Sequence, residues 1–191
     1  MSAGWTTRWT RGARAALLLG GLLAGTAGVA AAQAASDDGV SVVWLVRHAE
    51  RADDGMGDQP DPELSAPGRV RAAELARLLG DAGITSIHST PFRRTRQTAA
   101  PLAEALGLEV QAYDPRDPAA MEAFLARLAE PGRHVVVGHS NTTPDLVRRL
   151  GGDPVSPIDE MEYDRIYVVT RGPDGSITSS LLRFGAPAPG G

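Results

Sequence analysis

The sequence predicts an α/β protein with three layers, in which helices cover both faces of a mostly parallel central sheet. Two observations predict this fold class. Short runs rich in valine, leucine and isoleucine alternate with segments whose apolar residues recur at helical spacing. Glycine or proline stands where most of these segments have to end. Such alternation of strand and helix is typical of β-α-β units.

Each expected element follows from this periodicity and from its flanking residues. Ser65 is the expected N-cap of the first helix, where the apolar residues at helical spacing are Val70, Ala73, Leu75, Leu78 and Leu79. Pro173-Asp174-Gly175 predicts the turn of a closing hairpin. The expected elements are strand 42–46, helix 66–79, strand 84–88, a helix from 91 or 92 to 106, strand 108–112, helix 119–129, strand 134–137, helix 143–150 and strands 165–170 and 176–183.

Residues 1–34 have the layout of a secretory signal peptide. Three arginines precede an uncharged run of alanine, leucine and glycine, and the A-x-A pattern Ala32-Gln33-Ala34 predicts cleavage after Ala34. The alternative is an uncleaved anchor, since about 18 apolar residues just span a bilayer. We expect an exported protein, periplasmic or extracellular, with no membrane span after cleavage. A leader at 35–40, one domain at 41–184 and a disordered tail at 185–191 would follow.

Charge and cysteine content exclude several functions. The formal net charge is −4, and removal of the basic leader would make the protein more acidic. This balance argues against a nucleic-acid partner, which requires a basic face. The absence of cysteine excludes disulfides, a thiolate nucleophile and thiolate metal ligands.

Histidines and arginines stand at the ends of predicted strands. Arg47-His48 follows strand 42–46, and His139 follows the valine-rich strand 134–137. Ligands of open α/β sheets bind outside the carboxyl ends of the strands. A guanidinium binds oxyanions such as phosphate, and an imidazole can take a phosphoryl group covalently. The two histidines therefore predict one site for a phosphoryl group.

Residues 89–99 add three arginines at a junction of strand and helix: Arg93, Arg94 and Arg96. A helix N-terminus already favours anions through its unpaired N–H groups. Because neighbouring positions of a helix face different sides, one arginine should reach the site while the others face solvent or pair with acids.

Together these segments resemble the histidine phosphatase superfamily, which includes the cofactor-dependent phosphoglycerate mutases. Arg47-His48-Ala49-Glu50 is similar to the Arg-His-Gly-Glu of the mutase-like branch, and residues 89–99 resemble its Ser-x-Pro-x-x-Arg-Ala-x-Gln-Thr-Ala block. His139 matches a histidine after a valine-rich strand and glycine, and Leu64-Ser65-Ala66-Pro67-Gly68 is similar to Leu-Thr-x-x-Gly. The resemblance covers residues 41–184 and implies a phosphoglycerate mutase-like fold.

The resemblance implies a role for each matching residue. His48 would be the nucleophile that forms a phosphohistidine, while Arg47, Arg94 and His139 would bind the phosphoryl group and stabilise its charge. Glu50 is a further candidate for substrate binding. No metal or cofactor is implied, and the substrate would be a phosphorylated small molecule or a phosphoprotein.

Two positions depart from the family pattern. Ala49 replaces the glycine after the nucleophile, and its methyl group is either tolerated or tightens the pocket floor. Ser140 stands where the acid phosphatase branch carries its proton-donating aspartate. The donor would then be Asp114, which we favour, or Asp117 or Glu50; a good leaving group would need none.

We therefore expect an exported phosphatase that acts through His48. The short chain disfavours a mutase and a phytase, and the alternative is an inactive phosphate-binding or scaffold protein of the same fold. His88 and His134 are expected to be structural. Residues 159–164 are expected to be a solvated lead-in to the next strand, with the edge of a substrate entrance as the alternative. The remaining acids are expected to be a solvated surface rather than a metal site: Asp53, Asp54, Asp58, Asp61 and Glu63.

Overall fold

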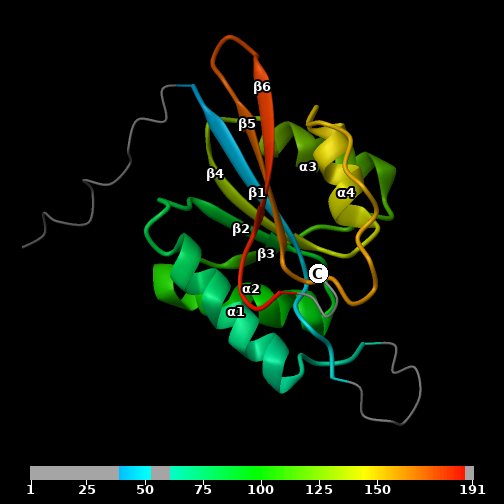
Figure 1. Ribbon diagram of the computed structural model, residues 1–191. Helices are drawn as coiled ribbons and strands as arrows, with labels where there is room; N and C mark the ends of the chain where they lie inside the picture. The colour runs from blue at the N-terminus through cyan, green and yellow to red at the C-terminus, as the bar shows by residue number, and fades with distance from the viewer. Residues whose placement is uncertain (1–38, 53–60, 188–191) are drawn as a thin grey trace, which may run out of the picture. The chain divides into compact units, whose positions relative to one another are not determined.

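A computed structural model describes residues 39–52 and 61–187, and these form a six-stranded sheet covered by helices on both faces (Figure 1). The predicted three-layer α/β/α class is confirmed. The elements are β1 (Ser41–Arg47), α1 (Ala66–Leu79), β2 (Ser86–Ser89), α2 (Arg93–Leu106), β3 (Val110–Ala112), α3 (Pro118–Leu128), β4 (Gly132–Gly138), α4 (Thr142–Arg149), β5 (Arg165–Arg171) and β6 (Ile177–Arg183).

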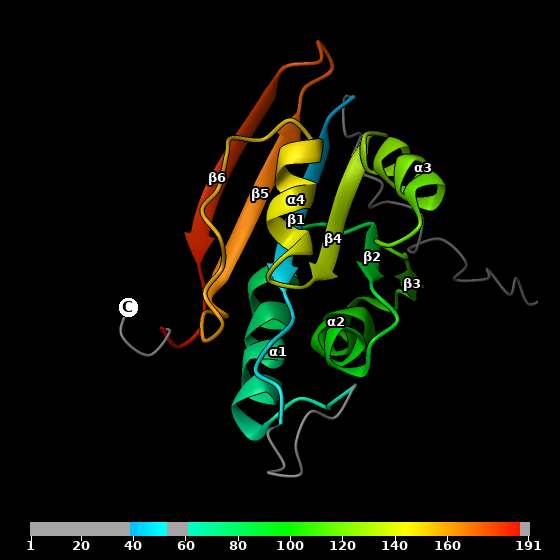
Figure 2. The ribbon, with the colours of Figure 1, turned by 90° about the vertical axis from the view of Figure 1, so that its right-hand side faces the viewer.

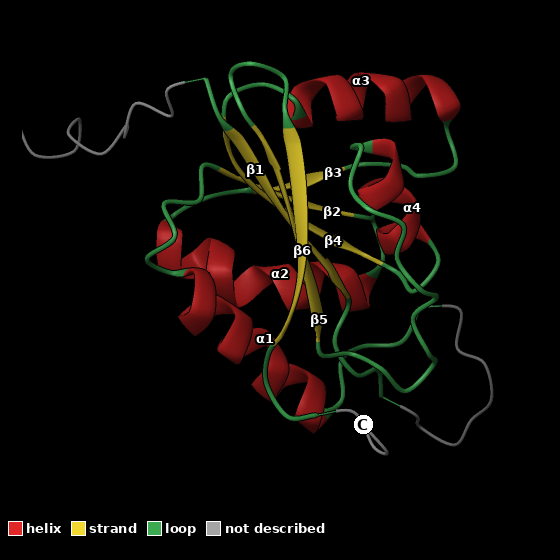
Figure 3. Cartoon of the chain, turned by 45° about the horizontal axis from the view of Figure 1, so that its top comes forward, coloured by secondary structure: helices red, strands yellow, loops and turns green. Residues whose placement is uncertain are grey.

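The sheet has the strand order β3-β2-β4-β1-β5-β6. The four strands from β3 to β1 are parallel, while β5 pairs antiparallel with β1 and with β6. The predicted closing hairpin is thus present, and it turns through 172–176, where the Gly172 N–H donates to the Ser176 carbonyl. Helices α1 and α2 lie on one face and α3 and α4 on the other (Figures 2 and 3).

Each face of the sheet has its own apolar core. Leu45 of β1 packs with residues of α3 and α4, such as Phe124 and Leu146, whereas its neighbour Val46 packs with residues of α1 and α2, such as Leu75 and Leu102. Successive side chains of a strand point to opposite faces, so a strand covered on both sides is apolar throughout. This explains the continuous run Val42–Val46.

The carboxyl ends of the parallel strands meet at one edge. Arg47 is in register with Gly138 of β4, and Ser89 of β2 is in register with the neighbouring Val137. The His48 N–H extends the ladder by donating to the Gly138 carbonyl at 2.9 Å. Three segments that are distant in sequence are thereby brought to one place.

Helix α1 has the predicted bounds, and Ser65 caps it by accepting from the Gly68 N–H at 3.1 Å. Its predicted apolar face is only partly correct. Leu75 and Leu79 are buried, but the structure exposes three of the expected positions: Val70, Ala73 and Leu78. The helix instead buries Gly68, Arg71 and Ala72. The hydrophobic pattern would place an arginine on the solvent face, so it does not predict that Arg71 is buried.

The predicted signal peptide at 1–34 lies outside the described residues, as do 35–38 of the leader, 53–60 and the end of the tail at 188–191. In the part of the chain that the structure describes, no helix has the length and apolar character needed to cross a membrane.

Candidate active site

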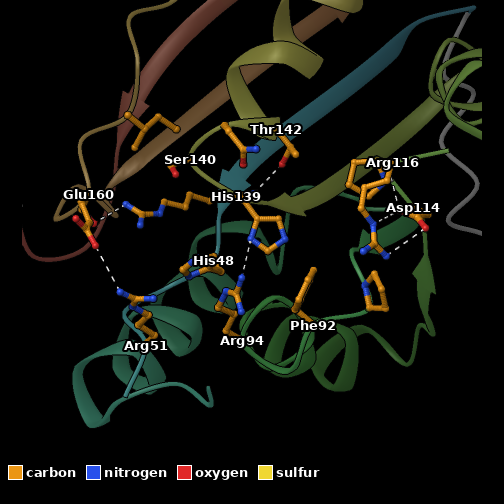
Figure 4. Close-up of a pocket in the computed structure, with 15 residues that line it drawn as sticks. His48, Arg51, Phe92, Arg94, Asp114, Arg116, His139, Ser140, Thr142 and Glu160 are labelled. Atoms are coloured by element: carbon orange, nitrogen blue, oxygen red, sulfur yellow. Dashed lines mark hydrogen bonds and ion pairs between the residues drawn. The ribbon is translucent and has the colours of Figure 1, made fainter. Parts of the chain in front are cut away.

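A cavity of about 590 Å³ opens at the carboxyl ends of the parallel strands (Figure 4). It brings together five of the residues predicted for the site: Arg47, His48, Arg94, Asp114 and His139. Glu50, the sixth, is not among the lining residues. The rest of the wall comes from Arg51, Pro91, Phe92, Pro115, Arg116, Ser140, Asn141, Thr142, Ile158 and Glu160.

His48 is held in one orientation directly after β1. Its Nδ1 lies 2.8 Å from the Ala49 carbonyl oxygen, which can only accept, so Nδ1 carries the proton. Nε2 then has a free lone pair and no hydrogen-bond partner within residues 39–52 and 61–187. Burial, and then the neighbouring Arg47, Arg94 and His139, lower the pKa of His48 to about 3. The imidazole is therefore neutral at pH 7 and available as a nucleophile.

Arg47 is buried and fixed by its surroundings. Its Nη1 donates to the carbonyls of Asp159, Glu160 and Glu162 at 2.8, 2.8 and 3.0 Å, and its guanidinium stacks on the Tyr163 ring at 4.2 Å. Nε is buried and has no partner among the described residues. Burial, the main cause, lowers its pKa, but arginine still remains charged.

Arg94 enters the cavity from the first turn of α2. Its guanidinium lies over the Phe92 ring at 4.6 Å, its Nη1 is 3.7 Å from the Asp61 carboxylate, and its Nη2 is 3.4 Å from Nδ1 of His139. Arg93 and Arg96 do not line this cavity; they face a separate groove beside β3. Only one of the three neighbouring arginines thus reaches the site, as expected.

His139 faces His48 across the cavity, with the ring centroids 5.5 Å apart. Its backbone N–H donates to Oγ1 of Thr142, the first residue of α4, at 2.9 Å, and its Nε2 is 2.9 Å from Oγ1 of Thr90. Burial, followed by Arg94 and Arg47, lowers the pKa of His139 to about 4. Both histidines are therefore uncharged at neutral pH, and the positive charge of the pocket resides on arginines.

Ala49 does not restrict the cavity, which agrees with the alternative in which its methyl group is tolerated. Its side chain is fully buried in a small cluster with Leu64 and Ala72, and the residue is not part of the cavity lining. Its N–H donates to Oγ1 of Thr98 at 2.9 Å, which joins the end of β1 to α2. The methyl group therefore points into the protein rather than toward a substrate.

The three candidate proton donors have different surroundings. Asp114 lines the cavity, and the backbone and side chain of Arg116 donate to it and lower its pKa. Asp117 caps α3 by accepting from the N–H groups of Ala119 and Ala120. The Glu50 carboxylate pairs with Arg71, away from the cavity, at 2.7 Å. Only Asp114 is positioned to meet a substrate.

Two groups of acidic residues are more structured than expected. Residues 159–164 are only partly the expected solvated lead-in: residues 159–161 are exposed, with Glu160 lining the cavity, while Glu162, Tyr163 and Asp164 are buried. Asp61 is also more than surface, because its Oδ1 accepts from the Arg93 N–H at 2.8 Å and thus caps α2. Within that acid group, residues 53, 54 and 58 lie outside the described part of the chain.

Sequence reasoning did not identify Arg51, Phe92 or Arg116 as lining residues, and it reached Glu160 only through the alternative that residues 159–164 border a substrate entrance. Arg51 and Glu160 form an exposed ion pair of 3.4 Å on one side of the cavity, and Arg116 and Asp114 form another of 3.2 Å on the other side (Figure 4). Phe92 occupies a variable position of the motif at 89–99, and the other three residues belong to no recognisable motif. Arg51 was detectable only as a further basic residue close to His48.

Comparison with known proteins agrees with the motifs. Residues 43–115 match the family model of the histidine phosphatase superfamily (branch 1). A protein of Escherichia fergusonii named "Probable phosphoglycerate mutase GpmB" is 39% identical over 77 residues, which are 39% of this chain and 35% of that protein. The chain thus matches about a third of the length of its curated relatives.

Solved structures share the fold. The protein histidine phosphatase SixA in complex with tungstate has a TM-score of 0.59 at 21% identity, with 74% of this chain and 96% of that chain covered. A phosphoglycerate mutase from Bacillus anthracis has a TM-score of 0.59 at 14% identity, with 76% and 94% covered. The family-model match over residues 43–115 agrees with the resemblance to the histidine phosphatase superfamily, and these structures show that the domain has a phosphoglycerate mutase-like fold.

Proposed function

We propose that this protein is a phosphatase that hydrolyses a phosphomonoester or a phosphohistidine through a covalent intermediate on His48. One observation carries the proposal. The free Nε2 of a neutral His48 lies in a cavity that Arg47, Arg94 and His139 also line. A lone pair surrounded by fixed cations is what attack on a phosphoryl group requires.

In the first step, the Nε2 lone pair attacks phosphorus and the bond to the leaving group breaks. The leaving group takes the bonding electron pair, and the imidazole becomes a phosphorylated cation. Its Nδ1–H keeps its hydrogen bond to the Ala49 carbonyl, which stabilises the new charge. Arg47 and Arg94 stabilise the phosphoryl oxygens, so that positioning and electrostatics provide most of the catalysis.

In the second step, water attacks the phosphorus of the phosphohistidine. The P–Nε2 bond breaks and its electron pair returns to the imidazole, while the attacking water passes its proton to the Asp114 carboxylate, the proposed donor of the first step. The products are inorganic phosphate and neutral His48. Because Arg47 is held by three carbonyls and an aromatic ring, it has little freedom to move between the two steps.

Asp114 is the proposed proton donor, since it is the only one of the three candidates that lines the cavity. Its lowered pKa means that it would have to gain a proton when Arg116 turns toward the substrate. Asp114→Asn should therefore slow the hydrolysis of alkyl phosphates and leave p-nitrophenyl phosphate almost unaffected, because nitrophenolate leaves without protonation. Equal effects on both substrates would remove Asp114 from this role.

The decisive experiment compares hydrolysis of p-nitrophenyl phosphate and of a phosphohistidine substrate by the wild-type protein and by His48→Ala. We expect loss of activity in His48→Ala and an acid-labile phosphoryl group on His48 after rapid quenching and mass spectrometry. His134→Asn, which alters a histidine outside the cavity, is the matched control. Equal activity in wild type and His48→Ala would disprove the nucleophile assignment.

The same assays distinguish the phosphatase from two alternative functions. Similarity to GpmB over part of the chain makes a phosphoglycerate mutase the second candidate, which isomerisation of phosphoglycerate would reveal. Phosphate binding without turnover would indicate an inactive scaffold.

We further propose that the protein is exported with cleavage after Ala34, which N-terminal sequencing of the mature protein would test.

A further inference from the structure

A pair of buried hydroxyl groups lies behind the cavity, on the far side of His139. Thr90 and Thr95 are both fully buried, and their Oγ1 atoms are 2.8 Å apart. Oγ1 of Thr90 is also 2.9 Å from Nε2 of His139. A hydroxyl has one proton to donate, so this chain of contacts fixes where each proton lies.

Thr95 determines the direction of the hydrogen bonds between the two hydroxyl groups and His139. Its Oγ1 is 2.8 Å from the Phe92 carbonyl oxygen and 3.0 Å from the Thr90 carbonyl oxygen. Carbonyls only accept, and a Thr95 proton directed to one of them leaves the Thr95 oxygen to accept from Thr90, the arrangement that the Arg94 contact below supports independently. With its proton directed to Thr95, Thr90 can only accept from His139. Nε2 of His139 therefore carries a proton.

The opposite side of the ring agrees with this assignment. Nη2 of Arg94, which can only donate, lies 3.4 Å from Nδ1 of His139. A proton on Nδ1 would set two donors against each other. The neutral ring thus presents a bare lone pair to the cavity, and in this state it cannot donate to a phosphoryl oxygen.

We infer that Thr90 is a positioning residue that holds His139 in its Nε2–H tautomer, so that the site takes up a proton at Nδ1 when it binds a phosphoryl dianion. This inference rests on the proposed function, because it takes His139 to contact the phosphoryl group. In the bound state, Nδ1–H donates to the anion while Nε2–H keeps Thr90 as its acceptor. The proton comes from solvent or from a monoanionic substrate.

The charges around His139 determine when this proton is gained. Arg94 of α2 and Arg47 and His48 at the end of β1 oppose protonation, and Asp61 favours it. Together with burial, the two arginines keep the pKa of His139 near 4 in the free protein. A bound dianion adds negative charge beside Nδ1 and raises that pKa. Binding should therefore weaken as the pH rises.

The direct test is nitrogen-15 NMR of the full-length protein with labelled histidine, with His139 assigned from a His139→Gln variant. Long-range nitrogen–proton correlations distinguish the two tautomers. We expect the Nε2–H form at pH 7 without ligand, and protonation of Nδ1 after addition of sulfate, a dianion that does not itself titrate near this pH. An Nδ1–H form in the free protein, or an Nδ1 that stays unprotonated with sulfate bound, would overturn the inference.

Two substitutions separate the hydroxyl from the packing. Thr90→Val keeps the shape but removes the acceptor, so the Nδ1–H tautomer should appear and sulfate binding should lose its pH dependence. Thr90→Ser keeps the hydroxyl and should behave like wild type. Thr95→Val releases the Thr90 proton to point at Nε2, and should also produce the Nδ1–H form. Wild-type tautomers in both valine variants would contradict the role of the hydroxyl pair.

Kinetics provide a second measurement. In Thr90→Val we expect kcat/KM to fall about tenfold, the size of one lost hydrogen bond. The pH profile of KM should change with it, and Thr90→Ser should restore both; a purely structural role would lower activity at all pH values alike. An inactive wild-type protein would refute the proposed function and leave the NMR result valid, because the tautomer is measured without ligand.

Discussion

At the scale of single residues, the two adjacent side chains Arg47 and His48 are fixed by different means. His48 uses the carbonyl of the next residue, a contact within its own segment. Arg47 uses carbonyls more than one hundred positions away, in the segment before β5. The proposed nucleophile is thus oriented by local structure, whereas the neighbouring arginine depends on the complete fold.

Ala49 provides a test of how the residue after the nucleophile acts. Because its methyl group packs on Leu64 and Ala72, Ala49→Gly should leave kcat/KM within about twofold of wild type. It should lower the free energy of unfolding by about 1 kcal/mol through a small cavity and a more flexible unfolded chain. Phosphatase assays and urea titration measure the two effects. A tenfold gain in activity would show that the methyl group does narrow the pocket.

Residue types at strand ends were predictable from the sequence, but most of their contacts were not. The run Val42–Val46 and the valines of β4 identify buried strands, and a parallel sheet brings their ends together. Nothing local shows that residues 159–164 fold back over Arg47, or that Asp61 caps α2. These contacts join segments that are far apart in sequence and have no period of their own.

At the scale of elements, α1 connects the end of β1 to the end of the chain. The close approach requires Gly68, because a Cβ there would lie 2.1 Å from the Glu50 carbonyl oxygen. The buried Arg71 pairs with the Glu50 carboxylate and donates to the carbonyls of Phe184 and Ala186 at 2.9 Å each. The helix thus holds the segment that follows His48 against the C-terminal segment.

Loss of this connection should be costly. Arg71→Met leaves a carboxylate and two carbonyls without their donor, and we expect the free energy of unfolding to fall by about 3 kcal/mol. The control is Arg77→Met in the last turn of the same helix, where the side chain is exposed and the expected change is within about 0.5 kcal/mol. Urea titration of both variants provides the comparison. Similar losses would mean that the apolar contacts of α1 dominate instead.

The position of Arg71 also explains why the predicted face of α1 was partly wrong. A helical pattern assigns apolar residues to the core, but this helix packs against the polar backbone that follows β1. An arginine can donate hydrogen bonds to carbonyls at this contact, which an apolar side chain cannot do. Val70 and Leu78 face solvent instead. Periodicity identifies a helix well; it does not show what the helix packs against.

At the scale of the whole molecule, two apolar cores hold the sheet, while burial lowers the pKa of three histidines far enough that they are uncharged at neutral pH. His48 and His139 belong to the site, and His88 lies under α3 in edge contact with Phe124, with its Nε2 2.8 Å from Oγ of Ser86. Burial, then His134 and Arg127, lower the pKa of His88 to about 4. The fold therefore favours neutral histidine in places that serve catalysis and in places that do not.

This common feature predicts a loss of stability in acid. Histidine in the unfolded chain takes up a proton below about pH 6.5, whereas folded His88 does so only near pH 4. Its contribution to stability is thus complete above pH 6.5, decreases as the pH falls toward 4 and changes no further below. From pH 7 to pH 5 the loss from His88 alone is about 2 kcal/mol. Urea titrations at both pH values should show that His88→Leu loses less stability than wild type by this amount. His48→Ala alters a histidine of the site and should remove a separate part of the acid-induced loss. Equal losses in wild type and His88→Leu would mean that other groups, such as the paired carboxylates, control unfolding in acid.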